Sequence, residues 1–264
     1  MSGDEVFALV LSLVLAGVAW GKSIHETLRI RSCPSSRPAL RLMPLAVPLA
    51  SACILYYVLR HYASHDVRDS TVYTTFYMIM GAAWVGAVLW IWQLLGITLR
   101  DDLLERGNSA AACAIAGAMI ALTFCFAGGN VGDGPGWWVV VFAALLSTGA
   151  LLVLWCVLER VSGLNEAITV DRDPASGLRA AGYLIGFGAI LGRAVAGNWV
   201  SAGATITDFA VLGWPALIVL VIGVILEKAL GPNARAPQRS ALVFGLPVFL
   251  GVLAASVWYL KVKS

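Results

Sequence analysis

Long apolar runs separated by short polar segments make up most of the chain. An α-helix needs about 20 apolar residues to cross the hydrocarbon core of a bilayer, and the runs are close to this length. Lipid offers no hydrogen-bond partner to backbone groups, so each membrane-crossing run is expected to be helical. The pattern predicts eight spans, of which the first is the shortest, at residues 5–21, 42–60, 73–97, 109–128, 137–158, 178–197, 207–228 and 240–261.

The composition supports this interpretation. Apolar residues make up 59% of the chain and charged residues 12%, and the mean hydropathy is +0.83. A soluble globular domain carries about 25% charged residues, so this chain has too few charges to cover a water-exposed surface. We therefore expect an all-α, polytopic membrane bundle. Asp4 and Glu5 precede the first run without a basic residue, which favours a retained span over a cleaved secretory signal.

Lysine and arginine are divided unevenly between the two predicted sides of the membrane. The loops after spans one, three, five and seven hold 13 of the 18, and the other side holds the remaining five: Arg60, Arg68, Arg193, Lys261 and Lys263. Cytoplasmic loops are enriched in these residues, so the side with 13 is predicted to be cytoplasmic. Both termini are then expected to lie outside. Residues 32–38, SCPSSRP, are predicted to be a linker.

Two stretches of the second half resemble each other. Gly129-Asn130 aligns with Gly197-Asn198, and Glu159-Arg160 aligns with Glu227-Lys228, each at a shift of 68 positions. Two helices per copy return the chain to its starting side, so the copies are expected to be parallel rather than inverted. The predicted organisation is a three-helix segment (1–97), repeat 1 (98–160), repeat 2 (161–230) and a C-terminal helix (231–264).

Small residues are concentrated in the first helix of each predicted repeat. Gly182 with Gly186, and Gly188 with Gly192, are pairs of small residues four positions apart, which let helix backbones approach closely. Tight packing within the bundle is the expected role, and a pair of flexible helices lining a pathway is the alternative. The candidate packing residues are Gly117, Gly182, Gly186, Gly188 and Gly192.

Asparagines near helix ends are candidates for a polar site. Asn130 and Asn198 each follow a glycine at an outer helix end, where a Gly-Asn pair favours a left-handed C-cap. The alternative is that both amides face a shared polar mouth. Asn108 precedes the Ala-rich helix of the first repeat and is a further candidate.

Charged residues near the predicted span ends are the remaining candidates. Arg193 lies near the outer end of span six and Asp208 lies at the start of span seven, so the two are expected to pair across the turn or to act in recognition or permeation. Glu159 and Glu227 stand beside a basic residue at cytoplasmic ends. Both are expected to anchor the helices at the membrane interface.

No sequence motif indicates catalysis or a cofactor. The chain has no nucleotide-binding loop, GxSxG, HExxH or CxxC, and no basic patch with interleaved aromatics that would suggest nucleic acid. His61 and His65 are four positions apart, but a metal would need further ligands, so a solvated loop is expected there. The sequence therefore predicts neither an enzyme nor a metal or cofactor site.

Residues 100–122, RDDLLERGNSAAACAIAGAMIAL, resemble the uncharacterised bacterial membrane-protein family catalogued as domain of unknown function 350. That family has an acidic residue, a Gly-Asn pair and an Ala-rich helix in a two-helix unit that occurs twice. The matching residues are Asp101, Asp102, Glu105, Gly107, Asn108 and Ala110 to Ala112, and in the second copy Asp171, Asp173, Gly177, Ala180 and Ala181. Leu178 replaces the asparagine in the second copy. The resemblance covers the second half of the chain and implies a bacterial inner membrane, no assigned chemistry and a link to membrane-stress systems.

These observations favour an integral inner-membrane protein with a structural or partner-binding role in membrane maintenance or stress. A homo-oligomer and a protein partner on the cytoplasmic side are expected, with the lipid bilayer around the helices. The alternative is a channel or transporter for ions or small solutes, with a path between the two repeats. That alternative needs polar groups at mid-membrane depth, in which the sequence is poor.

Overall fold

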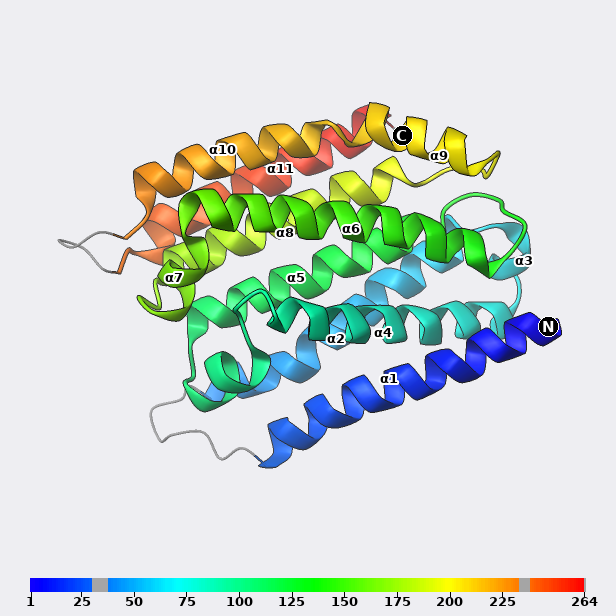
Figure 1. Ribbon diagram of the computed structural model, residues 1–264, viewed down its shortest axis with the longest axis horizontal. Helices are drawn as coiled ribbons and strands as arrows, with labels where there is room; N and C mark the ends of the chain where they lie inside the picture. The colour runs from blue at the N-terminus through cyan, green and yellow to red at the C-terminus, as the bar shows by residue number, and fades with distance from the viewer. Residues whose placement is uncertain (30–37, 233–237, 264) are drawn as a thin grey trace.

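The computed structural model describes residues 1–29, 38–232 and 238–263, and within these ranges it contains helices and no β-strand (Figure 1). Residues 32–37 of the predicted linker lie outside the described residues. The long helices are α1 (Gly3–Arg29), α2 (Pro38–His61), α4 (Thr71–Gln93), α5 (Ser109–Gly128), α6 (Trp137–Ser162), α8 (Pro174–Ala194) and α11 (Leu246–Lys263). The shorter elements are α3 (His65–Arg68), η1 (Leu99–Glu105), α7 (Leu164–Thr169), α9 (Ala202–Gly213), α10 (Pro215–Leu230) and η2 (Ala241–Gly245).

Seven helical segments among the described residues are long and apolar enough to cross a membrane, and the bent pair α9 and α10 makes an eighth candidate. This confirms the prediction of an all-helical, multi-pass membrane protein. The predicted first span was too short, because α1 is 27 residues long.

The span predicted as one helix at 207–228 is instead broken, with a bend of 41° between α9 and α10. Pro215 begins α10. Proline has no backbone N–H and its ring clashes with the preceding turn, so a continuous helix cannot run through this position undisturbed.

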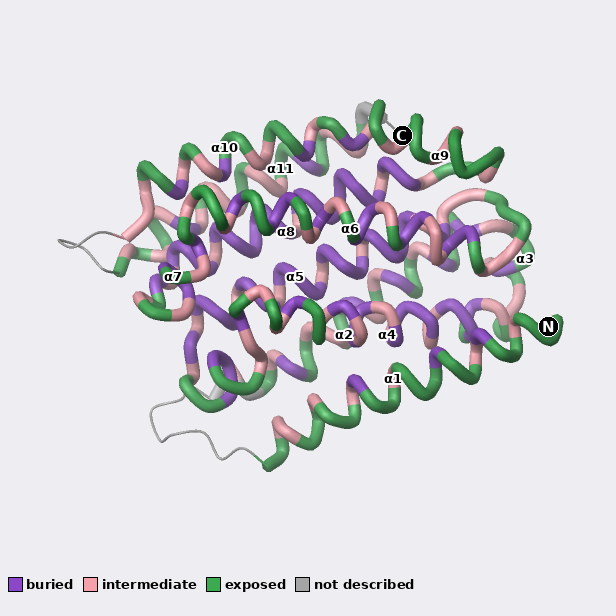
Figure 2. The backbone as a smooth tube through the Cα atoms, in the orientation of Figure 1, coloured by how far each residue is buried: buried purple, intermediate pink, exposed green. Residues whose placement is uncertain are grey.

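Helices α5 and α8 form the centre of the bundle, and the other helices surround them. In the membrane-length windows of α5 and α8, 78% and 83% of the residues are buried, against 17% in α1 and 11% in the α11 segment. Figure 2 shows the same contrast between the inner and outer helices. Helices α6, α10 and α11 pack on α8, α2 and α4 pack on α5, and α1 packs along α4.

Glycines bring the backbones of α5 and α8 into direct contact. A Cβ added at Gly188 would lie 2.5 Å from Ala121 Cα, and one at Gly128 would lie 2.0 Å from the Gly192 carbonyl oxygen. Gly117 likewise faces Ala181. Because these contacts advance in the same order along both helices, α5 and α8 run parallel.

A second face of α8 packs against α11. A Cβ added at Gly182 would lie 3.0 Å from Phe249 Cα, and one at Gly186 would lie 2.7 Å from Val252 Cγ1. The candidate packing glycines of α8 are thus divided between two neighbouring helices, with Gly188 and Gly192 on the α5 side.

Candidate functional site

The first turn of α8 begins at a buried aspartate. Asp173 is the N-cap, and its Oδ2 accepts hydrogen bonds from the Ser176 backbone N at 2.8 Å and from the Ser176 Oγ at 2.7 Å. Pro174 follows at the first helical position, where its missing N–H has no helical partner to lose. The helix therefore begins four residues before the predicted span 178–197, and Arg179 lies inside it.

Arg179 forms a two-pronged ion pair with Glu227 of α10. Its Nε donates to Glu227 Oε1 at 2.6 Å and its Nη2 donates to Oε2 at 2.7 Å. The Arg179 side chain is 0% exposed and the Glu227 side chain is 3% exposed. Matched geometry of this kind is the strongest that a guanidinium and a carboxylate can form.

Three further hydrogen bonds complete the surroundings of the pair. Arg179 also donates from Nη2 to Ser176 Oγ at 3.0 Å and from Nη1 to the Phe244 carbonyl at 3.1 Å. Tyr183, one turn after Arg179, donates its hydroxyl to Glu227 Oε1 at 3.0 Å. We call Asp173, Ser176, Arg179, Tyr183 and Glu227 the buried polar cluster.

The buried polar cluster connects segments that are far apart in the chain. Arg179 joins α8 to α10 through Glu227 and to η2 through the Phe244 carbonyl. Asp173 Oδ1 accepts a further bond from the Arg239 backbone N. Taking a charge out of water costs several kcal/mol unless it is paired and hydrogen-bonded, and here both conditions are met. The arrangement can hold the C-terminal helices against α8.

The predicted interfacial role of Glu227 is therefore wrong. Helix α10 continues to Leu230, so Glu227 lies within its last turn and points at α8, while Lys228 is exposed. Glu159 is half-buried, and its Oε2 accepts from the Asn165 backbone N at 2.6 Å at the start of α7.

Sequence reasoning missed three members of the cluster: Ser176, Arg179 and Tyr183. The signal that could have found them is Asp173-Pro174, an N-cap residue followed by a proline at the first helical position. With Asp173 as the N-cap, the helix begins at Pro174 and Arg179 lies within it rather than in the preceding loop. A charged residue inside a membrane helix requires a partner.

Asn108 is the N-cap of α5. Its Oδ1 accepts from the backbone N of Ala110 at 2.9 Å and of Ala111 at 3.3 Å, and its Nδ2 donates to the Ile168 carbonyl at 2.7 Å. The side chain therefore ties the start of α5 to α7. At the start of α8 the capping position is occupied by Asp173.

The predicted left-handed C-caps at the Gly-Asn pairs are wrong. Gly129 caps α5 with φ −66°, a right-handed conformation, and Asn130 instead donates its side-chain amide to the Phe126 carbonyl at 2.8 Å. Helix α8 ends at Ala194, so Asn198 lies beyond its cap. Of the non-glycine residues that the structure describes, Arg172 has a positive φ and neither asparagine does.

The two turns that carry these asparagines nevertheless lie side by side. Asn198 Oδ1 accepts from the Asp133 backbone N at 2.9 Å, and Trp199 N donates to the Asp133 carbonyl at 2.8 Å. Asn130 is buried and lines a cavity of about 130 Å³ at this end of the bundle. Asn198 is exposed, so the two amides occupy different environments.

Arg193 and Asp208 lie near the same end. Arg193 Nη1 donates to the Ala196 carbonyl at 3.4 Å, which places its guanidinium at the last turn of α8. Asp208 is an exposed residue of α9. Their pairing stays a prediction.

His61 and His65 have different partners. His61 Nδ1 lies 2.9 Å from the Tyr57 carbonyl, whereas His65 Nδ1 lies 2.8 Å from Asp69 Oδ2. The hydrogen bond from His65 lowers the pKa of the exposed Asp69 carboxyl. Within the described ranges, no group of three or more histidine, cysteine, aspartate or glutamate side chains is placed to hold a metal ion.

Comparisons of the chain with protein-family models, with curated proteins and with solved structures each find no match. The resemblance of residues 100–122 to the family catalogued as domain of unknown function 350 therefore stays a prediction.

Proposed function

We propose that the chain is a structural, partner-binding component of the bacterial inner membrane, without enzymatic activity of its own. The contact between α5 and α8 carries this proposal. A Cβ added at Gly128 would lie 2.0 Å from the Gly192 carbonyl oxygen, and one at Gly177 would lie 2.4 Å from Ala110 Cα. Backbones this close leave no room for a water-filled path between the two helices, which favours a rigid core over the alternative of a channel or transporter.

The buried polar cluster supports the same function. Charges inside membrane proteins often mark ion or proton pathways. Here both oxygens of Glu227 accept bonds from Arg179, and Tyr183 adds a third donor. Groups that are held in this way fasten helices together, which is the property that a structural component requires.

We also propose that residues 98–160 and 161–230 form two parallel repeats. Helices α5 and α8 run in the same direction, and each follows a short helical element, η1 or α7, and a side-chain N-cap. The continuous α6 corresponds in this proposal to the bent pair α9 and α10, so the second hairpin differs from the first.

The proposed orientation has both termini outside. The two ends of the chain lie towards the same end of the bundle in Figure 1, as an even number of crossings requires. The loops predicted for the opposite side hold 13 of the 18 lysines and arginines of the sequence. Arg100, Asp101, Glu105 and Arg106 are exposed there and offer charged groups to a cytoplasmic protein partner.

The outer helices leave large apolar side chains exposed, which suits contact with lipid or with a second copy of the chain. Phe7 and Val14 of α1, Ile225 of α10 and Trp258 of α11 are each more than half exposed. We propose that lipid covers most of this surface and that copies of the chain assemble through part of it.

A flux measurement separates the structural role from transport. Full-length protein in liposomes should pass protons, K⁺, Na⁺ and Cl⁻ no faster than protein-free liposomes do. A saturable flux in the original chain, above that of the protein-free liposomes, would reject the proposal.

A mass measurement tests assembly. The chain extracted with native lipids should have a protein mass above the 27.9 kDa of one copy, either as a multiple of it or with a stoichiometric partner. A complex that contains one copy and no other protein would contradict a structural, partner-binding role.

A further inference from the structure

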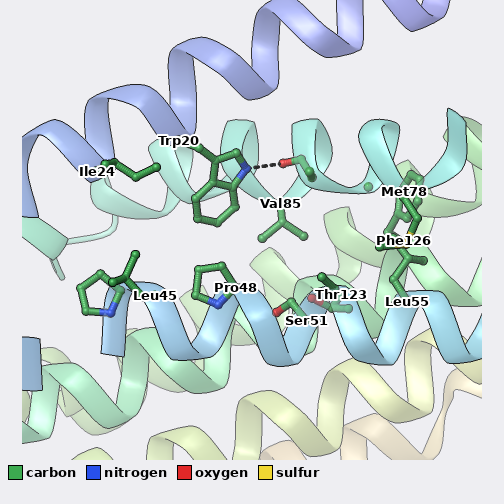
Figure 3. Close-up of a pocket in the computed structure, with 14 residues that line it drawn as sticks. Trp20, Ile24, Leu45, Pro48, Ser51, Leu55, Met78, Val85, Thr123 and Phe126 are labelled. Atoms are coloured by element: carbon green, nitrogen blue, oxygen red, sulfur yellow. Dashed lines mark hydrogen bonds between the residues drawn. The ribbon is translucent and has the colours of Figure 1, made fainter. Parts of the chain in front are cut away.

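A cavity of about 330 Å³ lies between α1, α2, α4 and α5 (Figure 3). Trp20 of α1 and Pro48 of α2 face each other across it, with Val85 of α4 beside them. The Trp20 indole is held in place, because its Nε1 donates to the Ala82 carbonyl at 2.9 Å. Helix α1 packs along α4 and touches α2 much less, so α1 and α2 leave space between them.

The walls of this cleft are mostly apolar and its size is that of a small ligand. Leu55 and Phe126 close one end, where a Cβ added at Gly81 would lie 2.3 Å from Leu55 Cδ2 and 2.9 Å from Phe126 Cε1. At about 30 Å³ for each non-hydrogen atom, the share of one molecule in liquid water, the cavity holds on the order of ten such atoms. Ligand pockets begin at about 300 Å³.

Ser51 brings a polar group into the apolar wall. It lines the cavity, is 8% exposed, and its Oγ has no hydrogen-bond partner among the described residues. Two other buried helix serines form such bonds: Ser147 donates to the Ala143 carbonyl and Ser256 donates to the Val252 carbonyl, each at 2.9 Å. A bond to the carbonyl four residues earlier is the usual solution for a serine in a helix. Ser51 therefore retains an unused donor and acceptor.

The same wall contains two prolines inside α2, Pro44 and Pro48. Pro48 has no N–H, so the Pro44 carbonyl cannot receive the hydrogen bond that position 48 would otherwise donate. The α2 wall thus combines one unpaired hydroxyl with a helix turn that lacks one backbone hydrogen bond.

We propose that this cleft binds an apolar membrane alcohol, with about ten of its non-hydrogen atoms inside and its hydroxyl on Ser51. A hydroxyl both donates and accepts, so the alcohol can pair with the Ser51 hydroxyl in either direction. A plain acyl chain fills the same volume but leaves Ser51 unpaired. The test must therefore separate these two occupants.

Photolabelling of the full-length protein in lipid nanodiscs tests the site, with a decanol that carries a diazirine group as the probe. Labelled peptides should contain residues 44–55 and 78–85. Unlabelled decanol should displace the probe at about fivefold lower membrane mole fraction than decane does, because one net hydrogen bond contributes about that factor. Ser51→Ala should bring the two competitors to within about twofold of each other.

Two pairs of variants control for packing. Ala52→Phe fills the cleft and should abolish the site-specific label, whereas Cys53→Phe changes the exposed neighbour on the same helix and should not. Ser256→Ala matches Ser51→Ala as a buried serine elsewhere, and should leave the preference for decanol unchanged. If Ser51→Ala fails to fold, the comparison of decanol with decane on the original chain decides the question.

The proposal is overturned if decane competes as well as decanol on the original chain, since a plain acyl chain is then the occupant. It is also overturned if the label spreads evenly over all helices and is unchanged in Ala52→Phe.

Discussion

Arg179 and Glu227 lie 48 positions apart in the chain, and their side chains meet in a two-pronged ion pair with N–O distances of 2.6 and 2.7 Å. Both side chains are buried, so bulk water solvates neither charge. The pair fixes α10 against α8 at the end of the bundle that is predicted to be cytoplasmic. Removing one partner leaves the other as an uncompensated buried charge.

Arg179→Ala and Glu227→Ala should each destabilise the protein strongly. Breaking a buried pair from one side typically costs about 3–5 kcal/mol. The double variant should cost less than the sum of the two single changes, because it leaves no unpaired charge. Unfolding in detergent, followed by tryptophan fluorescence, measures all three. Lys228→Ala is the control and should have little effect, since Lys228 is exposed beside Glu227.

Additive losses in the double variant would show that the two residues act independently. A single variant as stable as the Lys228→Ala control would show that the pair contributes little to the fold.

The packing of α5 on α8 makes a second prediction, about glycine. Gly188→Leu should lower stability by about 1–3 kcal/mol or more, since overpacking has this cost and the Cβ alone would lie 2.5 Å from Ala121 Cα. Gly186→Leu should also destabilise, but less, because its nearest contact is the Val252 side chain, which can move. Gly149→Leu is the control, since nothing lies within 4 Å of a Cβ there.

Thermal stability in detergent checks the order of the three variants. Equal unfolding temperatures for Gly188→Leu and Gly149→Leu would mean that α5 and α8 can move apart without loss of stability. That result would remove the main support for a rigid core.

The helix starts provide a third prediction. Asn108→Ala and Asp173→Ala should each cost about 0.5–2 kcal/mol for the lost N-cap, and more in total because each side chain has a second, long-range bond. Ser201→Ala removes the N-cap of α9, which is exposed and bonds only within its own turn, so it should have the smallest effect. Unfolding temperatures under one detergent condition compare the three. If Ser201→Ala lowers the unfolding temperature as much as Asn108→Ala and Asp173→Ala do, the long-range hydrogen bonds contribute nothing to stability.

Local signals explain which parts of the fold could be predicted from the sequence. Helix α5 occupies the predicted span 109–128 because Asn108 is a strong N-cap and the apolar run is uninterrupted. The bend before Pro215 could also have been predicted, because a proline in the interior of a predicted span removes a backbone hydrogen bond and favours a kink. The span count follows from run length alone, because lipid allows few alternatives to a helix.

The Asp173-Pro174 pattern could have placed Arg179 inside α8, but no local pattern identifies the partners of the site residues. The partner of Arg179 is set by how α10 packs on α8, and Glu227 looked like an interfacial residue because a lysine follows it. The Ser51 hydroxyl has no hydrogen-bond partner among the described residues, whereas Ser147 and Ser256 bond within their own helices. From their spacing, all three serines could bond to the carbonyl four residues earlier in their helix. Only the structure shows that Ser51 differs, beside two prolines and a cavity.

The orientation in the membrane gives the last prediction. Thirteen lysines and arginines lie in the loops at one predicted side and five at the other, and positive charge favours the cytoplasm. Alkaline phosphatase fused after Ser264 should therefore be active, and green fluorescent protein at the same point should be dark. Fused after Leu230, where α10 ends, the two reporters should give the opposite result. The two fusion points flank one membrane crossing, so each reporter serves as the control for the other. Fluorescence at Ser264 would invert the topology and place the buried polar cluster at the outer end of the bundle.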